Sequence, residues 1–84
     1  MSDFKIKVMI VDDIPETRQL LAKLLAFDDD IEIVGKASDG LEAIRLARKT
    51  VPDVVLMDIG MPHMDGIRAT RVLVESVPTA AVVI

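Results

Sequence analysis

The chain has 84 residues and no cysteine, which excludes disulfides, thiolate metal ligands and cysteine nucleophiles. Its 14 acidic residues outnumber the 10 basic ones, and Phe4 and Phe27 are its only aromatic residues, so we expect no direct nucleic-acid binding. No segment resembles a signal peptide or could span a bilayer, so we expect a cytoplasmic protein without membrane contact. A composition with 51% hydrophobic residues is typical of one small globular domain with an aliphatic core.

The first half of the chain predicts a strand, a helix and a second strand. Residues 6–11 form an apolar, β-branched run, typical of a strand buried on both faces, and the run ends at Asp12 and Asp13. Asp13 precedes a proline by two residues and a glutamate by three, which predicts a helix that is capped by Asp13 and runs to Phe27. The alternating residues 31–34 predict a strand closer to the edge of a sheet.

The second half repeats the alternation. A helix is predicted between the turn at residues 38–40 and the Val51–Pro52 pair, followed by a buried strand over residues 54–57 that ends at Asp58. A third helix and a final strand, residues 80–84, complete the pattern. The apolar residues at helical spacing in the first helix are Leu20, Leu21, Leu24, Leu25 and Phe27. The inner stripe of the second helix is expected to be Leu41, Ile44 and Ala47 or Arg48, and the third helix is expected to run through Ile67, Thr70, Leu73 and Val74.

This order, βαβαβαβ, predicts an α/β fold with a parallel sheet, the first helix on one face and the other two helices on the opposite face. Binding sites in such sheets form at the carboxyl ends of the strands. Asp12, Asp13 and Asp58 all follow strands at that edge, so we expect their carboxylates to converge.

Such a cluster favours a bound cation. Two carboxylates about 4 Å apart repel each other by roughly 4 kcal/mol at an effective dielectric constant of about 20, and a third adds to this. An all-oxygen pocket that retains water and accepts phosphate oxygens suits Mg²⁺. A carboxylate beside such a metal can attack phosphorus and form an aspartyl phosphate.

A purely structural interpretation of the acids competes with this one. Asp13 and Glu16 could form a capping box, so a helix-capping role for Asp13 is as plausible as a role in a site. Asp12 and Asp58 fit this interpretation less well, because each follows an apolar run where a desolvated carboxylate needs a partner.

Four segments of the chain form a specific combination: VDD at 11–13, SDGLEA at 38–43, LMD at 56–58 and MPHMDG at 61–66. In these segments the sequence resembles the receiver domains of two-component response regulators. The resemblance implies a flavodoxin-like three-layer fold with strand order 2-1-3-4-5. It implies that Asp58 takes a phosphoryl group from a histidine kinase or a phosphotransfer protein, without the chain being a turnover enzyme. It also implies that Asp12, Asp13, Asp58 and the backbone carbonyl of Gly60 hold Mg²⁺, Asp12 largely through water.

The chain departs from the family pattern in two respects. Gly60 stands where the family often has asparagine, which leaves the backbone carbonyl in place but removes a side chain. The family also continues through a fifth strand and two further helices, with a Ser or Thr and a Lys that contact the phosphoryl group, whereas this chain stops at Ile84. We therefore expect residues 1–84 to be the amino-terminal two-thirds of one receiver domain, with an apolar edge at Ala80–Ile84 that could form a homodimer or a segment-swapped oligomer.

Two other interpretations of the whole chain remain open. In the first, the fold is a non-switching interaction or assembly module and the acids bind only metal or nothing. A phosphatase with two paired acids fits less well, because Asp12 and Asp13 are adjacent rather than separated by one residue. His63 is expected to be a solvated loop residue, since no second His or Cys supports a metal site there.

Overall fold

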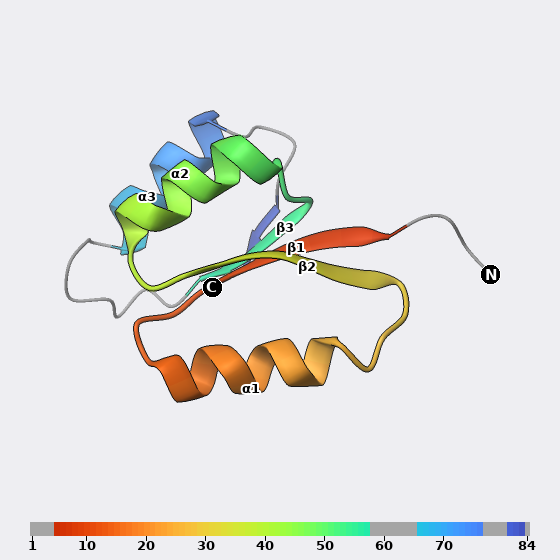
Figure 1. Ribbon diagram of the computed structural model, residues 1–84. Helices are drawn as coiled ribbons and strands as arrows, with labels where there is room; N and C mark the ends of the chain where they lie inside the picture. The colour runs from red at the N-terminus through yellow and green to blue at the C-terminus, as the bar shows by residue number, and fades with distance from the viewer. Residues whose placement is uncertain (1–4, 58–65, 77–80, 84) are drawn as a thin grey trace.

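The computed structural model describes residues 5–57, 66–76 and 81–83. Within these ranges strands and helices alternate along the chain, as the sequence predicts (Figure 1). None of the described helices is long and apolar enough to cross a membrane. The elements are β1 (Ile6–Val11), α1 (Pro15–Leu25), β2 (Ile31–Ala37), α2 (Gly40–Thr50), β3 (Val54–Met57), α3 (Gly66–Ser76) and β4 (Ala81–Val83).

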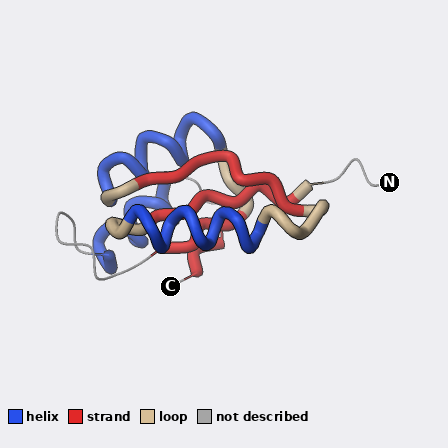
Figure 2. The backbone as a smooth tube through the Cα atoms, turned by 60° about the horizontal axis from the view of Figure 1, so that its bottom comes forward, coloured by secondary structure: helices blue, strands red, loops and turns tan. Residues whose placement is uncertain are grey.

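The strands form one parallel sheet in the order β2-β1-β3-β4. The sheet lies between two helical layers, with α1 on one face and α2 and α3 on the other (Figure 1). Figure 2 shows the same arrangement from a second direction, with α1 in front of the strands. The predicted flavodoxin-like α/β class, strand order and placement of the helices are therefore confirmed.

The main core lies between the sheet and the α2/α3 layer. Successive residues of β1 point to opposite faces, so that Met9 and Val11 enter this core while Val8 and Ile10 are buried on the α1 face. Small residues of α2 allow the helix to approach the strands closely. The buried members of the core cluster are Met9, Val11, Ala37, Ala43, Ile44, Ala47, Val55, Met57 and Leu73.

The α1 layer is thinner. Helix α1 packs on β1 and β2, yet none of its residues is buried. Leu20 and Leu24 are more than half exposed, and Phe27 lies beyond the end of the helix with 85% of its surface exposed. Helical spacing therefore does not identify the side of α1 that faces the sheet, where half-buried residues such as Leu21 and Leu25 lie. In α2, Leu41 is also more than half exposed, so the prediction that it belongs to the inner stripe of that helix is wrong.

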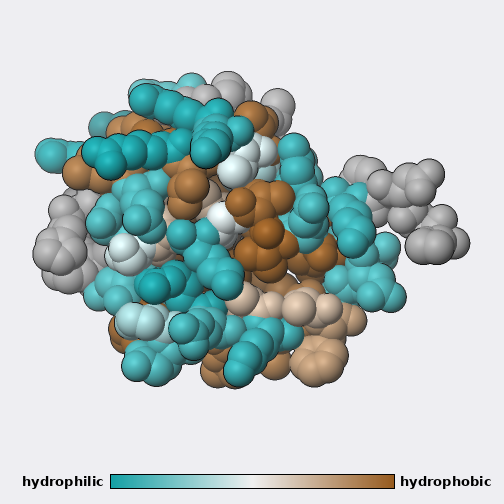
Figure 3. Space-filling model, viewed as in Figure 1, coloured by the Kyte–Doolittle hydropathy of each residue, from teal (hydrophilic) through white to brown (hydrophobic). Residues whose placement is uncertain are grey.

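Strand β2 contains an irregularity that changes its register against β1. Val8 pairs with Ile33, but the next residue, Met9, pairs with Gly35, so Val34 is an extra residue on β2. The space-filling view shows apolar atoms gathered along this edge strand, between the two helical layers (Figure 3). Beyond the extra residue the strand continues to Ala37, three residues further than the sequence pattern predicts.

Helix α2 has well-defined ends. At its start the Asp39 carboxylate accepts a hydrogen bond from the Glu42 N–H at 2.9 Å, and the Glu42 carboxylate accepts one from the Ser38 N–H at 3.0 Å. These bonds satisfy backbone donors that a helix start leaves unpaired. At its end Val51 adopts a left-handed conformation with φ of 48°, which is unusual for a β-branched residue.

Candidate functional site at the carboxyl edge of the sheet

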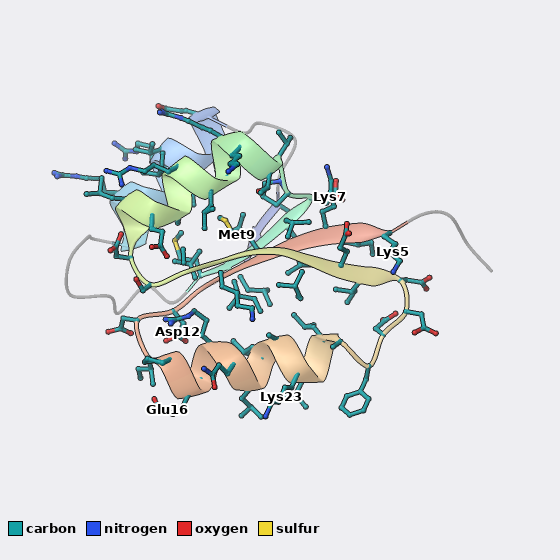
Figure 4. The ribbon with its side chains drawn as sticks, in the orientation of Figure 1. Lys5, Lys7, Met9, Asp12, Glu16 and Lys23 are labelled. Atoms are coloured by element: carbon teal, nitrogen blue, oxygen red, sulfur yellow. The ribbon has the colours of Figure 1, made fainter. Side chains whose placement is uncertain are left out.

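The carboxyl ends of β1 and β3 lie side by side. The two strands are parallel neighbours, and Val11, at the end of β1, pairs with Met57, at the end of β3. Asp12 follows β1 directly and lies where the chain turns from β1 toward α1 (Figure 4). Asp58 is next to Met57 in the sequence, but Asp58 and Gly60 lie outside the described residues, so their predicted roles stay predictions.

Asp12 is the only buried charged side chain among the described residues, with 6% of its surface exposed. Its backbone N–H donates to the carbonyl oxygen of Ala37 on β2 at 3.0 Å. Its carboxylate oxygen Oδ1 accepts a hydrogen bond from the Ile14 N–H at 2.9 Å. A buried carboxylate needs such partners, and here they also fix the direction in which the side chain leaves the strand.

Asp13 does not have the predicted capping role. The N-cap residue of α1 is Ile14, which has no side-chain capping bond, and Pro15 follows it as the first helical residue. The prediction that Asp13 caps this helix is wrong, because Ile14 is still extended and the helix therefore starts one residue later than predicted. The Asp13 side chain is half-exposed, and the structure does not support the interpretation that it serves only to cap a helix.

Arg18 was not identified as a site residue from the sequence. The half-buried Arg18 on α1 donates a hydrogen bond from its guanidinium Nη1 to the backbone carbonyl oxygen of Asp12 at 2.7 Å. A signal was available in the sequence, since a cation near the first turn of a helix opposes the helix dipole. Such a placement indicates a partner outside the helix.

The potential ligand atoms at this edge suit a hard divalent cation. Asp12 and Asp13 supply only carboxylate oxygens, the ligand type that Mg²⁺ prefers. The described part of the chain brings together no group of three or more His, Cys, Asp or Glu side chains that could hold a metal. A complete site therefore needs ligands such as Asp58, which lies outside the described residues.

Two lysine side chains lie at the opposite end of β1 from Asp12. Lys5 and Lys7 are placed near the amino-terminal end of β1, whereas Asp12 lies at the carboxyl end (Figure 4). Neither lysine is therefore placed to take part in the acidic site.

Comparison with known proteins identifies the family. Residues 8–84 match the response regulator receiver domain family. The chain belongs to this receiver domain family. A solved relative, the response regulator domain of Thermotoga maritima CheB, superposes with a TM-score of 0.84 at 38% identity, covering 93% of this chain and 57% of that one. The CheX–CheY–BeF3–Mg complex from Borrelia burgdorferi superposes with a TM-score of 0.85 at 32% identity, covering 94% of this chain and 60% of that one.

The curated relatives are much longer than this receiver domain chain. Protein-glutamate methylesterase/protein-glutamine glutaminase 4 of Myxococcus xanthus is 40% identical over 84 residues, which is all of this chain and 24% of that protein. The chain thus spans about a quarter of that relative. The enzymatic activity in the relative's name describes the whole protein, whereas the match to this chain covers its receiver part.

Proposed function

We propose that this receiver domain accepts a phosphoryl group on Asp58 from the phosphohistidine of a histidine kinase or a phosphotransfer protein, in a step that requires Mg²⁺. The pairing of Val11 with Met57 is the observation that most supports this proposal. Because the two strands end level with each other, an acid after β3 and the acids after β1 leave the sheet at the same edge.

The chemistry needs few groups from the protein. An oxygen of the Asp58 carboxylate attacks phosphorus, the P–N bond to the histidine breaks, and the imidazole leaves with the electron pair of that bond and takes up a proton. Asp12 and Asp13 would hold Mg²⁺ together with Asp58 and the Gly60 carbonyl. When bound, the ion neutralises charge on the carboxylates and on the transferring phosphoryl oxygens.

Two further parts of the proposal concern the extent of the domain and its assembly. Residues 1–84 would form the amino-terminal two-thirds of one receiver domain, supported by the 57% coverage of the Thermotoga domain. A homodimer or segment-swapped oligomer would use the Ala80–Ile84 edge, because β4 is the last strand of the sheet among the described residues. A cytoplasmic location fits a kinase partner and stays a prediction.

The test is phosphorylation with a small acyl phosphate, with and without Mg²⁺, followed by intact-mass measurement. We expect a mass increase of one phosphoryl group that requires Mg²⁺ and is absent in Asp58→Asn. Asp65→Asn is the control, because it removes the same charge seven residues later in the sequence without changing the proposed acceptor. A folded chain that gains no phosphoryl group under any of these conditions would contradict the proposal and favour an interaction module.

A further inference from the structure

Arg18 links helix α1 to the end of β1. Its guanidinium Nη1 lies 2.7 Å from the backbone carbonyl oxygen of Asp12, six residues earlier in the chain. The distance is at the short end of the range for N–H···O hydrogen bonds, and a charged donor makes such bonds stronger than neutral ones. The side chain is half-buried, so the bond is only partly open to competition from water.

With this bond, Asp12 is held by three different segments. Its N–H group bonds to Ala37 at the end of β2, its Oδ1 atom bonds to the Ile14 N–H in the loop, and its carbonyl bonds to Arg18 on α1. The backbone on both sides of the Asp12 Cα atom is therefore fixed, and so is one oxygen of the carboxylate. The bond from Arg18 is the only one of the three that a side-chain substitution removes without changing Asp12 itself.

The position of Arg18 is not explained by the stability of α1. Arg18 is the fourth residue of the helix, where the positive end of the helix dipole disfavours a cation. Its backbone N–H already bonds to the Ile14 carbonyl in the ordinary helical pattern, at 3.0 Å. The guanidinium therefore stabilises the segment that precedes the helix, through the Asp12 carbonyl, rather than the helix itself.

We propose that Arg18 is a positioning residue, which orients Asp12 before the divalent cation binds. The inference rests on the proposed Mg²⁺-dependent function. Side chains that orient metal ligands without touching the metal affect affinity strongly, by about 10- to 100-fold in typical cases. The positive charge of Arg18 acts in the opposite direction, because it repels a cation at the acidic edge, so we place the net loss at the lower end of that range.

The experiment compares Arg18→Met with the unchanged chain in two measurements. Titration calorimetry with Mg²⁺ is expected to show about tenfold weaker binding for Arg18→Met. Arg18→Lys, which keeps the charge and N–H donors but loses the planar guanidinium, is expected to bind with an affinity between those two. Amide hydrogen exchange, measured by NMR without Mg²⁺, is expected to be faster at the Ile14 N–H, because this donor depends on the orientation of Asp12. Lys23→Met, an exposed change in the last turn of the same helix, is the matched control and should alter neither quantity.

The two measurements separate the possible failures. If Arg18→Met binds Mg²⁺ as tightly as the unchanged chain or more tightly, the positioning role is overturned and the guanidinium acts only through its charge. If the unchanged chain binds no Mg²⁺, the proposed function fails. The exchange rate at Ile14 then still decides whether Arg18 orients Asp12, and an unchanged rate overturns the proposal.

Discussion

Asp53 and Lys7 are joined by two reciprocal hydrogen bonds at the amino edge of the sheet. The Asp53 N–H donates to the Lys7 carbonyl oxygen at 2.7 Å, and the Lys7 N–H donates to the Asp53 carboxylate at 2.8 Å. The carbonyl oxygen of Asp53 also accepts a bond from the Ala81 N–H at 2.9 Å. One residue before β3 thus connects the beginnings of β1, β3 and β4, at the edge opposite the acidic site.

Asp53→Ala is expected to destabilise the fold by about 1 kcal/mol, since it removes one side-chain hydrogen bond and leaves the Lys7 N–H to water. For a domain of this size that corresponds to a decrease of roughly 4–8 °C in Tm, measured by circular dichroism. Asp53→Asn, which keeps an acceptor oxygen, should lose less than half as much. An equal loss in both variants would show that the charge matters rather than the hydrogen bond.

Val51 at the end of α2 has an unfavourable backbone conformation. Its φ of 48° costs a residue with a Cβ atom about 1–2 kcal/mol, whereas glycine adopts it freely. Because both substitutions remove the same half-exposed side chain, we expect Val51→Gly to be more stable than Val51→Ala by about 1 kcal/mol. Chemical denaturation of the two variants measures this difference, and a more stable alanine variant would contradict the assignment of strain.

The start of α1 has no side-chain cap, so the stabilities of two variants at the N-cap position can be compared. Ile14 occupies the N-cap position and is about half exposed, so its replacement loses a limited amount of apolar contact. Ile14→Ser is expected to be more stable than Ile14→Ala by about 1 kcal/mol, because a hydroxyl at this position accepts a bond from the first turn. Equal denaturation midpoints would mean that the Asp12 carboxylate already blocks that geometry.

Mg²⁺ is expected to stabilise the chain through Asp13. A ligand at 100 times its dissociation constant adds about 2.7 kcal/mol of stability, so Tm should increase on titration with Mg²⁺. Asp13→Asn should abolish most of this increase while leaving the stability without metal unchanged or slightly higher, since a like charge beside Asp12 is removed. Asp29→Asn, an exposed change of the same charge, is the control and should respond to Mg²⁺ as the unchanged chain does.

Much of the fold could be predicted from the sequence because the strands are uniform and the helices are clearly bounded. The apolar runs that became β1 and β3 have the predicted bounds, and Asp39 caps α2 where the turn residues indicated. The end of β2 could not be predicted, because Val34 is an extra residue in the strand and interrupts the alternation of inward-facing and outward-facing side chains. The side of α1 that faces the sheet could not be predicted, because the leucines of this helix occupy more than one side and spacing alone does not distinguish them.

The candidate site was predicted in part. The burial of Asp12 follows from the apolar run before it, and its position at the carboxyl edge follows from the parallel topology. The place of Arg18 in the first turns of α1 indicates a partner outside the helix but does not identify it, because a long side chain six residues away reaches the Asp12 carbonyl only in one particular loop conformation. Asp58 and Gly60 stay predictions that rest on the sequence and the family.

The extra residue in β2 allows one strand to serve both layers. Ile33, before Val34, shares a face with Val8 on the α1 side, whereas Gly35 and Ala37, after it, lie on the side of Met9 and Val11. Deleting Val34 would therefore restore a regular register without changing any observed pair, because Ile33 would be followed directly by Gly35, the partner of Met9. Ala37 would stay in the core and would still accept the Asp12 N–H. Deleting Lys36 instead would move Ala37 into register with Ile10, on the α1 side, so the same loss of one residue would disrupt the core only when it falls after the extra residue.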